Sequence, residues 1–257
     1  MRGLLILTCL FFIVAGIAVH PGKAHPQGIP GTPGAAVGQP ADTPVYKPPL
    51  RGAPAGGSRI AAAVRGEEGA GSTVLVLAPD HVGLTSEKSP VLYWYLSKPE
   101  SGHIEFTLND ERKGQTIVRA DLPSPKQGGI QAIKLADLKA ELLPGVAYQW
   151  FVTLERDQDQ PSKDVYNGGS IMYEPPSAEL NKKLASAGTG APTIYAAEGL
   201  WYDAFSSTWK IGKAGTEKAA IQQRGSLLEQ VGFGAAAPGK SKPAVDTELE
   251  LLQLMRK

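Results

Sequence analysis

The chain has 257 residues, a length that allows one or two domains. Its 26 basic residues nearly balance 25 acidic ones, so the charge indicates neither a nucleic acid nor an anionic membrane surface as a partner. Cys9 is the only cysteine. If the amino terminus is removed, the remaining chain can form no disulfide, thiol nucleophile or cysteine-ligated metal site.

Residues 1–24 have the three parts of a secretory signal peptide. Arg2 gives a positive start, residues 4–19 form an apolar run, and a stretch of small residues ends at Ala24. The sequence favours cleavage after Ala24, with Ala18 as the second candidate. An uncleaved anchor is the alternative, but a bilayer core needs about 20 apolar residues and this run is shorter. We therefore expect a periplasmic or secreted protein whose mature chain has no transmembrane span.

Residues 25–72 are rich in Pro, Gly and Ala, a composition that buries too little apolar surface to order itself. We expect a disordered spacer that holds the folded part away from a membrane or partner. Cleavage after Ala24 would make His25 the amino terminus, where its amine and imidazole together could chelate Cu²⁺. His25 is therefore a candidate metal ligand, although it leads into a spacer rather than into a strand.

Between residues 73 and 176 the apolar residues recur with a period of two, which is typical of strands. The predicted strands are residues 74–77, 91–97, 103–109, 116–121, 130–135, 147–155 and 165–173. Trp94 and Trp150 are expected in the core. Tyr148 follows a Pro-Gly turn, so its hydroxyl can turn back onto the preceding loop as a tyrosine corner. These features favour an antiparallel β-sandwich of the immunoglobulin or fibronectin type, and a generic Pro-Gly turn is the alternative.

Residues 177–233 have the period of helices and predict a small C-terminal α-helical module, so the fold class is α+β. Ser177 can cap a first helix, a second begins at Thr193 and continues until Gly212, and a third covers residues 216–231. Residues 234–257 are expected to be a flexible tail that can hold one short helix.

Four aromatic residues are candidates for contacts with a partner. Tyr93, Tyr95 and Phe151 alternate with the core rows of their strands, so one sheet face could present them to a protein or a sugar. The alternative is that the helices cover them, because exposed apolar patches are uncommon without a function. Trp209 lies on a helix that is aromatic around most of its circumference, and it could mark a joint or a binding groove.

The sequence offers no catalytic set. A hydrolase triad needs a positioned nucleophile and a histidine base, and no Gly-x-Ser-x-Gly elbow is present. Asp157, Asp159 and Asp164 crowd one loop, and such oxygens are what Ca²⁺ prefers, but the loop lacks the glycine and closing glutamate of an EF-hand. A solvated turn is therefore the simpler interpretation. We expect no enzyme activity and no cofactor.

A six-residue motif, Gly199-Leu200-Trp201-Tyr202-Asp203-Ala204, resembles that of a bacterial family of exported proteins, domain of unknown function family 928. Gly199, Trp201, Tyr202 and Asp203 are its distinctive residues. Further matches follow in the same order, at residues 83–85, 91–96, 105–111, 145–150, 157–164 and 227–233. The resemblance implies a Gram-negative-type cell envelope and brings no activity and no catalytic residues. One departure is Gln160-Pro161-Ser162, where the family commonly has an Arg-Ser pair.

The sequence therefore predicts an exported envelope protein that acts as a non-enzymatic interaction or scaffold module. Its partner would be a protein or another envelope component. Two alternatives stay open. One is a copper-binding protein or metalloenzyme that uses His25, and the other is a carbohydrate-binding module that uses an aromatic strand face. The oligomeric state does not follow from the sequence.

Mass spectrometry of the mature protein tests the predicted cleavage site. We expect His25 as the first residue, because Gly22 and Ala24 give the small side chains that a signal peptidase accepts. Copper titration of that mature protein then tests the metal alternative. A different amino terminus, or no copper uptake, would rule out the alternative of a copper-binding protein or metalloenzyme that uses His25.

Overall fold

The computed structural model describes residues 43–49, 60–62, 71–157, 159–160, 164–211, 216–235, 240 and 242–256. All of them belong to one compact unit, Gln39–Lys257. The predicted signal peptide and His25 lie outside the described residues. None of the described helices combines the length and the apolar composition needed to cross a membrane.

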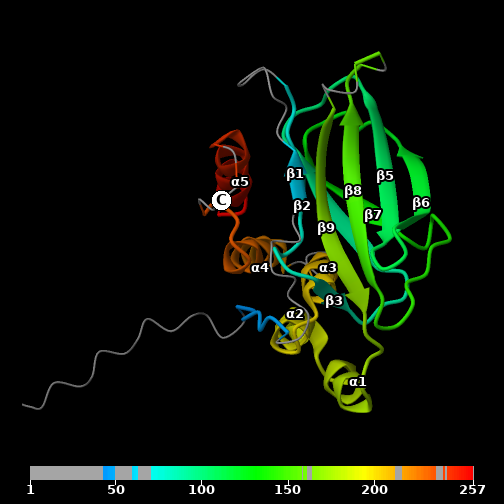
Figure 1. The fold of residues 1–257 in the computed structure, drawn as a ribbon. Helices are drawn as coiled ribbons and strands as arrows, with labels where there is room; N and C mark the ends of the chain where they lie inside the picture. Colours follow the sequence, from blue (N-terminus) through cyan, green and yellow to red (C-terminus); the bar gives the residue numbers. More distant parts are fainter. Residues whose placement is uncertain are drawn as a thin grey trace, which may run out of the picture. The chain divides into compact units, whose positions relative to one another are not determined.

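The strands of the described residues form two sheets (Figure 1). The larger sheet has the order β1 (Ile60–Ala62), β9 (Val165–Tyr173), β8 (Ala147–Glu155), β5 (His103–Asp110) and β6 (Gln115–Leu122). A further strand, β3 (Gly83–Thr85), also pairs with β9. The smaller sheet has the order β2 (Val74–Val76), β4 (Val91–Leu96) and β7 (Gly129–Lys134).

All seven predicted strands are present, and two short strands were not predicted. β1 and β3 have three residues each, too few for an alternating pattern to be recognised. They share one edge of β9, where β1 pairs antiparallel with residues 166–168 and β3 pairs parallel with residues 171–173. The prediction of a purely antiparallel sandwich is therefore wrong for this edge, and the larger sheet is mixed.

The two sheets pack face to face around alternating apolar residues. Trp94 is 2% exposed on β4, and Trp150 on β8 is fully buried. The inward rows of β4, β5 and β8 belong to one core cluster that also contains helical residues. Burial of each large apolar side chain stabilises the fold by about 1.5–3 kcal/mol. Tyr148 opens β8, and its hydroxyl accepts a hydrogen bond from the amide of Leu143 at 3.2 Å, which is the contact expected of a tyrosine corner.

The helical part begins with α1 (Ala178–Ala185), and Ser177 caps it by accepting a hydrogen bond from the amide of Leu180 at 3.1 Å. The other helical elements are η2 (Gly188–Gly190), α2 (Ala191–Ala197), α3 (Trp201–Ile211), α4 (Glu217–Gln230) and α5 (Lys242–Leu254). α3 contacts β3 and β4, α4 packs on α3, and α5 packs on α4. Figure 1 shows α3, α4 and α5 along one side of the sheets.

The single helix predicted from Thr193 onwards is in fact two helices, α2 and α3. Gly199 between them has a φ of +77°, a left-handed conformation that favours glycine. The amide of Leu200 donates to the carbonyl of Tyr195 at 2.9 Å, and the amide of Gly199 donates to that of Ala196 at 3.1 Å. These two bonds form a Schellman motif, which ends a helix. The apolar period continues through the break, and for this reason it predicted one helix.

The helices form a third layer rather than a separate module. The smaller sheet is buried on both faces, because Leu75 and Tyr95 on its outer side are 4% and 2% exposed. The short helix allowed for in residues 234–257 is present as α5, but it is packed rather than part of a flexible tail, since Leu251, Leu252 and Met255 are buried in the same core cluster as the sheets. The sequence pattern of α5 shows an apolar face but not the surface against which it packs.

Part of the predicted spacer is also packed. Residues 43–49, which we call the strap, lie beside α2 (Figure 1), and Tyr46 in the strap is 6% exposed. The amide of Lys47 donates to the carbonyl of Ala196 at 3.0 Å. The prediction of a spacer throughout residues 25–72 is therefore wrong here. One aromatic side chain and a few main-chain hydrogen bonds order a segment whose composition is that of a linker.

One hydroxyl group fastens α3 to the larger sheet. Tyr202 is 2% exposed, and its hydroxyl accepts a hydrogen bond from Trp150 Nε1 at 2.9 Å and donates to the carbonyl of Ser170 at 3.0 Å. Next to it, Trp201 Nε1 donates to the carbonyl of Leu77 at 3.4 Å. Burial raises the pKa of Tyr202, so the hydroxyl stays protonated and keeps both roles.

Tyr202→Phe should lower the free energy of unfolding by roughly 1–3 kcal/mol, because it leaves the indole N–H of Trp150 without an acceptor in the core and removes the hydroxyl bond to Ser170. Urea denaturation measures the change. Tyr166→Phe is the matched control, since Tyr166 is 40% exposed, and it should change stability by less than about 0.5 kcal/mol. Equal effects of the two variants would contradict this role of Tyr202.

Candidate functional site

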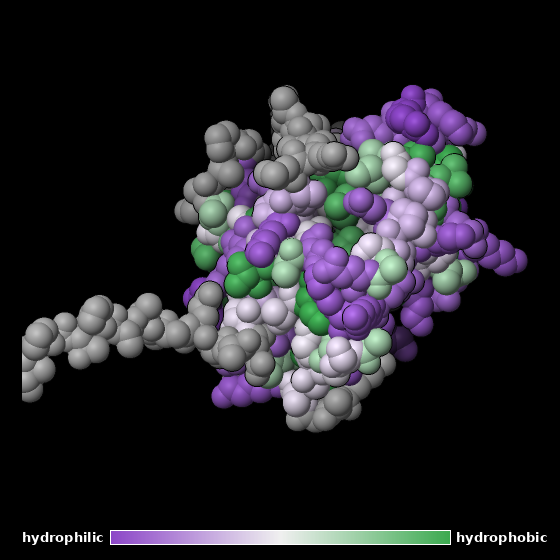
Figure 2. All heavy atoms as spheres, turned by 90° about the horizontal axis from the view of Figure 1, so that it is seen from below, coloured by the Kyte–Doolittle hydropathy of each residue, from purple (hydrophilic) through white to green (hydrophobic). Residues whose placement is uncertain are grey.

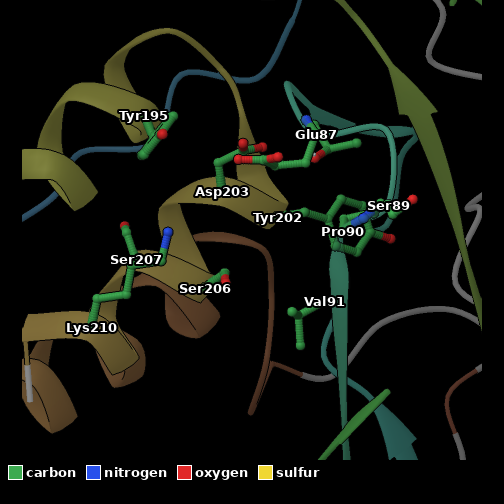
Figure 3. A pocket seen from close by; sticks show the side chains of 11 residues that line it. Glu87, Ser89, Pro90, Val91, Tyr195, Tyr202, Asp203, Ser206, Ser207 and Lys210 are labelled. Atoms are coloured by element: carbon green, nitrogen blue, oxygen red, sulfur yellow. Dashed lines mark hydrogen bonds between the residues drawn. The ribbon is translucent and has the colours of Figure 1, made fainter. Parts of the chain in front are cut away.

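A pocket of about 210 Å³ lies where α2, α3 and the segment between β3 and β4 meet (Figure 3). Most of its lining residues have polar side chains. The lining residues are Thr85, Glu87, Ser89, Pro90, Val91, Tyr195, Tyr202, Asp203, Ser206, Ser207 and Lys210.

Asp203 is the most unusual group in this pocket. It lies in the first turn of α3, where a carboxylate interacts favourably with the helix dipole, and it is only 6% exposed. Its Oδ2 accepts a hydrogen bond from the amide of Ser86 at 3.0 Å, and its Oδ1 accepts one from the Ser86 hydroxyl at 2.6 Å. The carboxylate therefore holds the turn after β3 against α3.

Burial changes the pKa values of two groups that line the pocket, Asp203 and Tyr195. Burial raises the pKa of Asp203 from 3.8 to about 6, although hydrogen bonds from Ser86 and Thr85 oppose this and the charge of Glu87 adds to it. Burial also raises the pKa of Tyr195, with the charges of Asp203 and Glu87 adding to the effect. The lining thus carries two carboxyl groups and one cationic side chain, Lys210, which is exposed.

A carboxyl group with a pKa near 6 could transfer protons close to neutral pH. Both oxygens of Asp203, however, accept hydrogen bonds from Ser86, and none of the lining residues is a histidine or a cysteine. The volume is also below the roughly 300 Å³ at which pockets for drug-sized ligands begin. We therefore interpret Asp203 as a residue that holds α3 against the sheets. Its pKa is raised because it is buried at this contact.

The residues of the six-residue motif lie where α3 packs against the sheets, a region that we call the joint. Each of them makes a different contact there. Gly199 makes the turn, Trp201 and Tyr202 bond to the sheets, and Asp203 holds Ser86. These contacts show that the motif contributes to the buried joint between the layers. On the face of the molecule in Figure 2, small apolar areas are separated by hydrophilic residues.

The four predicted contact residues are divided between two faces. Tyr95 is 2% exposed, so it is covered, as the alternative prediction expected, and is not an exposed contact residue. Tyr93 stacks on Trp209 with ring centroids 5.5 Å apart, and the Arg224 guanidinium lies 3.8 Å from the centroid of the Trp209 ring. The helices thus cover these side chains, because the outer face of the smaller sheet is itself apolar.

Phe151 differs from the other three because it lies on the outer face of the larger sheet. Its side chain is half-buried, and its ring packs edge-on against Tyr166, with centroids 6.3 Å apart. Gly168 lies beneath this ring, since a Cβ atom there would be 2.4 Å from Phe151. The sequence pattern identified Phe151 on β8 but not Tyr166, its contact partner on the neighbouring strand β9.

The predicted metal ligands do not form a site in the described part of the chain. The amide of Asp159 donates to Asp157 Oδ1 at 3.1 Å, as in a local turn. Burial and the nearby charges of Glu155 and Asp157 raise the pKa of Asp164. No group of three or more His, Cys, Asp or Glu side chains that could hold a metal ion is present among the described residues.

Sequence reasoning missed three residues that matter here. Ser86 and Glu87 lie in a polar turn with no pattern of its own, and they gain importance only because α3 packs against them. Tyr46 did carry a signal, since it is a lone aromatic between prolines in a segment otherwise low in aromatics. An aromatic at such a place indicates a docking contact.

A protein family described as Domain of Unknown Function (DUF928) matches residues 55–240, well over half of the chain. The chain belongs to the DUF928 family. The resemblance that the motif around Trp201 indicated is thereby confirmed. No curated protein and no solved structure matches the chain. The pocket and the joint lie within the DUF928 region, whereas the strap and α5 lie outside it.

Asp203→Asn should remove a pH dependence from the stability of this DUF928 protein. Because folding raises the pKa of Asp203 from 3.8 to about 6, the folded state binds the proton more tightly. The resulting stabilisation is complete below about pH 4 and is lost as the pH rises through 6. Relative to the variant, the unmodified protein should lose roughly 2–3 kcal/mol between pH 4 and pH 7.

Urea denaturation at both pH values measures this difference, and the other titrating groups cancel between the two proteins. The control is Asp137→Asn, which removes an exposed carboxyl group and should leave the pH dependence unchanged. A constant difference between the unmodified protein and Asp203→Asn would show that Asp203 is not the titrating group.

Proposed function

We propose that this protein is an exported, non-enzymatic interaction module of the cell envelope, and that it binds its partner through the outer face of the larger sheet. The proposal rests chiefly on one observation. The helices cover the smaller sheet, whereas the larger sheet carries a partly exposed aromatic pair, Phe151 and Tyr166, on its outer side. We call this surface the open face.

The surroundings of the aromatic pair support a contact role. Thr107 lies directly across from Phe151 in the register of β5 and β8. Glu105 pairs with Arg119 at 3.4 Å nearer the β6 edge. An aromatic centre with polar and charged residues around it is the usual composition of a protein interface.

A cluster of three titratable side chains lies at one end of the same face. His103 contacts Glu155 through Nδ1 and Asp121 through Nε2, both at 3.1 Å. The hydrogen bond with Glu155 raises the pKa of His103, as does the charge of Asp121. The open face thus has an aromatic centre and charged or polar groups at one end. A partner with both apolar and charged groups fits it best.

The order of the strands supports a sandwich of the fibronectin type, the finer form of the fold that we propose. Without β1 and β3, the first, second and fifth strands face a sheet of the third, fourth, sixth and seventh. In the immunoglobulin arrangement the fourth strand joins the first sheet instead. Tyr148 opens the sixth strand, where such folds place the tyrosine corner. Domains of this architecture commonly serve as cell-surface modules.

Two further features support the non-enzymatic and exported parts of the proposal. The strongest candidate for an acid or base, Asp203, has both oxygens engaged by Ser86. Export rests on residues 1–24, whose sequence has the parts of a secretory signal.

The second candidate function is carbohydrate binding by the same face. The pair of Phe151 and Tyr166 favours it, because an accessible aromatic ring can stack on the apolar side of a sugar. A protein partner and a glycan would use the same two side chains. The experiment must therefore separate them by what binds rather than by which residue is lost.

Tyr166→Ala and Phe151→Ala should each weaken binding to purified envelope fractions by about tenfold or more, because aromatic side chains at the centre of an interface contribute about 2 kcal/mol. Cosedimentation with protein-containing membranes and with isolated peptidoglycan measures this. Leu143→Ala is the control, since Leu143 is an apolar side chain that is 55% exposed in the loop before β8.

Loss of binding to membranes but not to peptidoglycan would support a protein partner, and a glycan array read with the same variants would detect a sugar. Thermal unfolding confirms that each variant is folded. If Tyr166→Ala and Phe151→Ala bind as well as Leu143→Ala does, the open face is not the contact surface.

A further inference from the structure

The strap is held in an extended conformation by alternate side chains. Pro44 and Tyr46 are buried, whereas Val45 and Lys47 between and after them are exposed. Such alternation is how a binding groove recognises an extended peptide, with pockets for every second side chain. The strap thus resembles a bound peptide ligand more than a loop of the fold.

Main-chain hydrogen bonds hold the strap from two sides. The Gln230 side chain accepts from the amide of Tyr46 at 2.8 Å and donates to the carbonyl of Pro44 at 2.9 Å. On the other side, the carbonyl of Ala196 accepts from the amide of Lys47 at 3.0 Å. One glutamine side chain that forms hydrogen bonds with both a donor and an acceptor of an extended backbone is a typical element of peptide recognition.

Tyr46 itself is enclosed by aromatic and polar groups. Its ring meets Trp201 edge-on at 5.3 Å and stacks on His81 at 5.7 Å. Its hydroxyl lies 2.8 Å from Nε2 of His81. A tyrosine with its ring between two aromatic groups and its hydroxyl bonded is a well-defined anchor.

The close approach of the strap also involves the motif. A Cβ atom on Gly199 would lie 2.9 Å from the carbonyl oxygen of Lys47, so glycine leaves the space that the strap occupies. We call the surface formed by His81, Ala196, Gly199, Trp201 and Gln230 the strap groove. All five residues lie within the region that matches the DUF928 family, whereas the strap precedes that region.

We propose that the strap groove is a peptide-binding site for an extended segment with a tyrosine among prolines, and that the strap is its tethered, exchangeable ligand, which a second copy of the chain can also supply. Every copy carries the same residues 43–49, so the chemistry of the second ligand is that of the first. This site is separate from the open face, and its test does not depend on the proposed envelope function.

The length of the connection allows this exchange. Ten residues separate the strap from β1, a stretch that can span up to about 35 Å when extended. Because the strap belongs to the same chain as the groove, its binding is intramolecular, so the closed form prevails over a free segment in dilute solution. Exchange then requires a competing segment at a comparable concentration.

The first experiment uses a fluorescent peptide of residues 43–49 and the full chain with Tyr46→Ala, which removes the aromatic anchor of the tethered strap. Fluorescence anisotropy measures binding. We expect the peptide to bind the variant at least about tenfold more tightly than it binds the unmodified chain, whose own strap competes. A peptide with alanine in place of the tyrosine is the control, and it should not bind. Gln230→Ala, added to the variant, should weaken binding of the original peptide.

The unmodified chain provides an independent measurement in case Tyr46→Ala does not fold. Excess peptide should speed hydrogen exchange at the amides of Tyr46 and Lys47, which donate to Gln230 and Ala196 in the closed form. Failure of the peptide to bind a folded Tyr46→Ala chain would overturn the proposal. Unchanged exchange at these two amides with millimolar peptide would overturn it as well.

The second experiment tests the second copy as a source of the ligand. A photo-reactive amino acid replaces Pro49, which is partly exposed and lies beside Gly199 of the strap groove, since a Cβ atom on Gly199 would be 3.6 Å from Pro49 Cδ. Chains labelled with ¹⁵N are mixed with unlabelled chains, and cross-links from position 49 to the strap groove are identified by mass. We expect cross-links between labelled and unlabelled chains to increase with protein concentration and to disappear when the free peptide is added.

Cross-links that stay within single chains at every concentration would overturn the exchange between copies. No cross-links to the strap groove in any form would show that the strap does not bind there. Both results are independent of binding to the open face, so this proposal and the proposed function can fail separately.

Discussion

The hydroxyl of Tyr202 is the contact on which the arrangement of the layers depends. It bonds to Trp150 in the core of the sandwich and to the main chain of β9, and so it fixes α3 against the larger sheet. α4 packs on α3 and α5 packs on α4, so the position of each later helix follows from this first one. A buried hydroxyl with two partners gives direction to a contact that apolar packing alone would leave approximate.

The position of α3 also explains the features that look functional. Asp203 follows Tyr202 by one residue, so fixing the tyrosine carries the carboxyl group into a buried place beside Ser86. Its pKa rises because water is excluded there, which is also what raises the pKa of many catalytic acids. Here both carboxylate oxygens accept hydrogen bonds from Ser86, and the raised pKa of Asp203 follows from its buried place between α3 and the turn after β3.

The three layers leave two surfaces with different characters. Where the strap crosses α2 and α4, a segment of the chain itself fills the groove with Tyr46. Over the larger sheet nothing in the described residues lies across Phe151 and Tyr166 as the helices lie across Tyr93. The proposed contact through the open face and the proposed exchange of the strap would therefore use separate surfaces of the molecule.

The sequence by itself determined the seven main strands, the cap at Ser177 and membership of the DUF928 family, because each depends on local patterns or on a motif of adjacent residues. Only the tertiary structure decided the break at Gly199, the burial of Tyr95 and the docking of Tyr46, since each depends on a surface supplied by a distant part of the chain. Periodicity identifies the apolar face of an element, but it contains no information about which other element will cover that face.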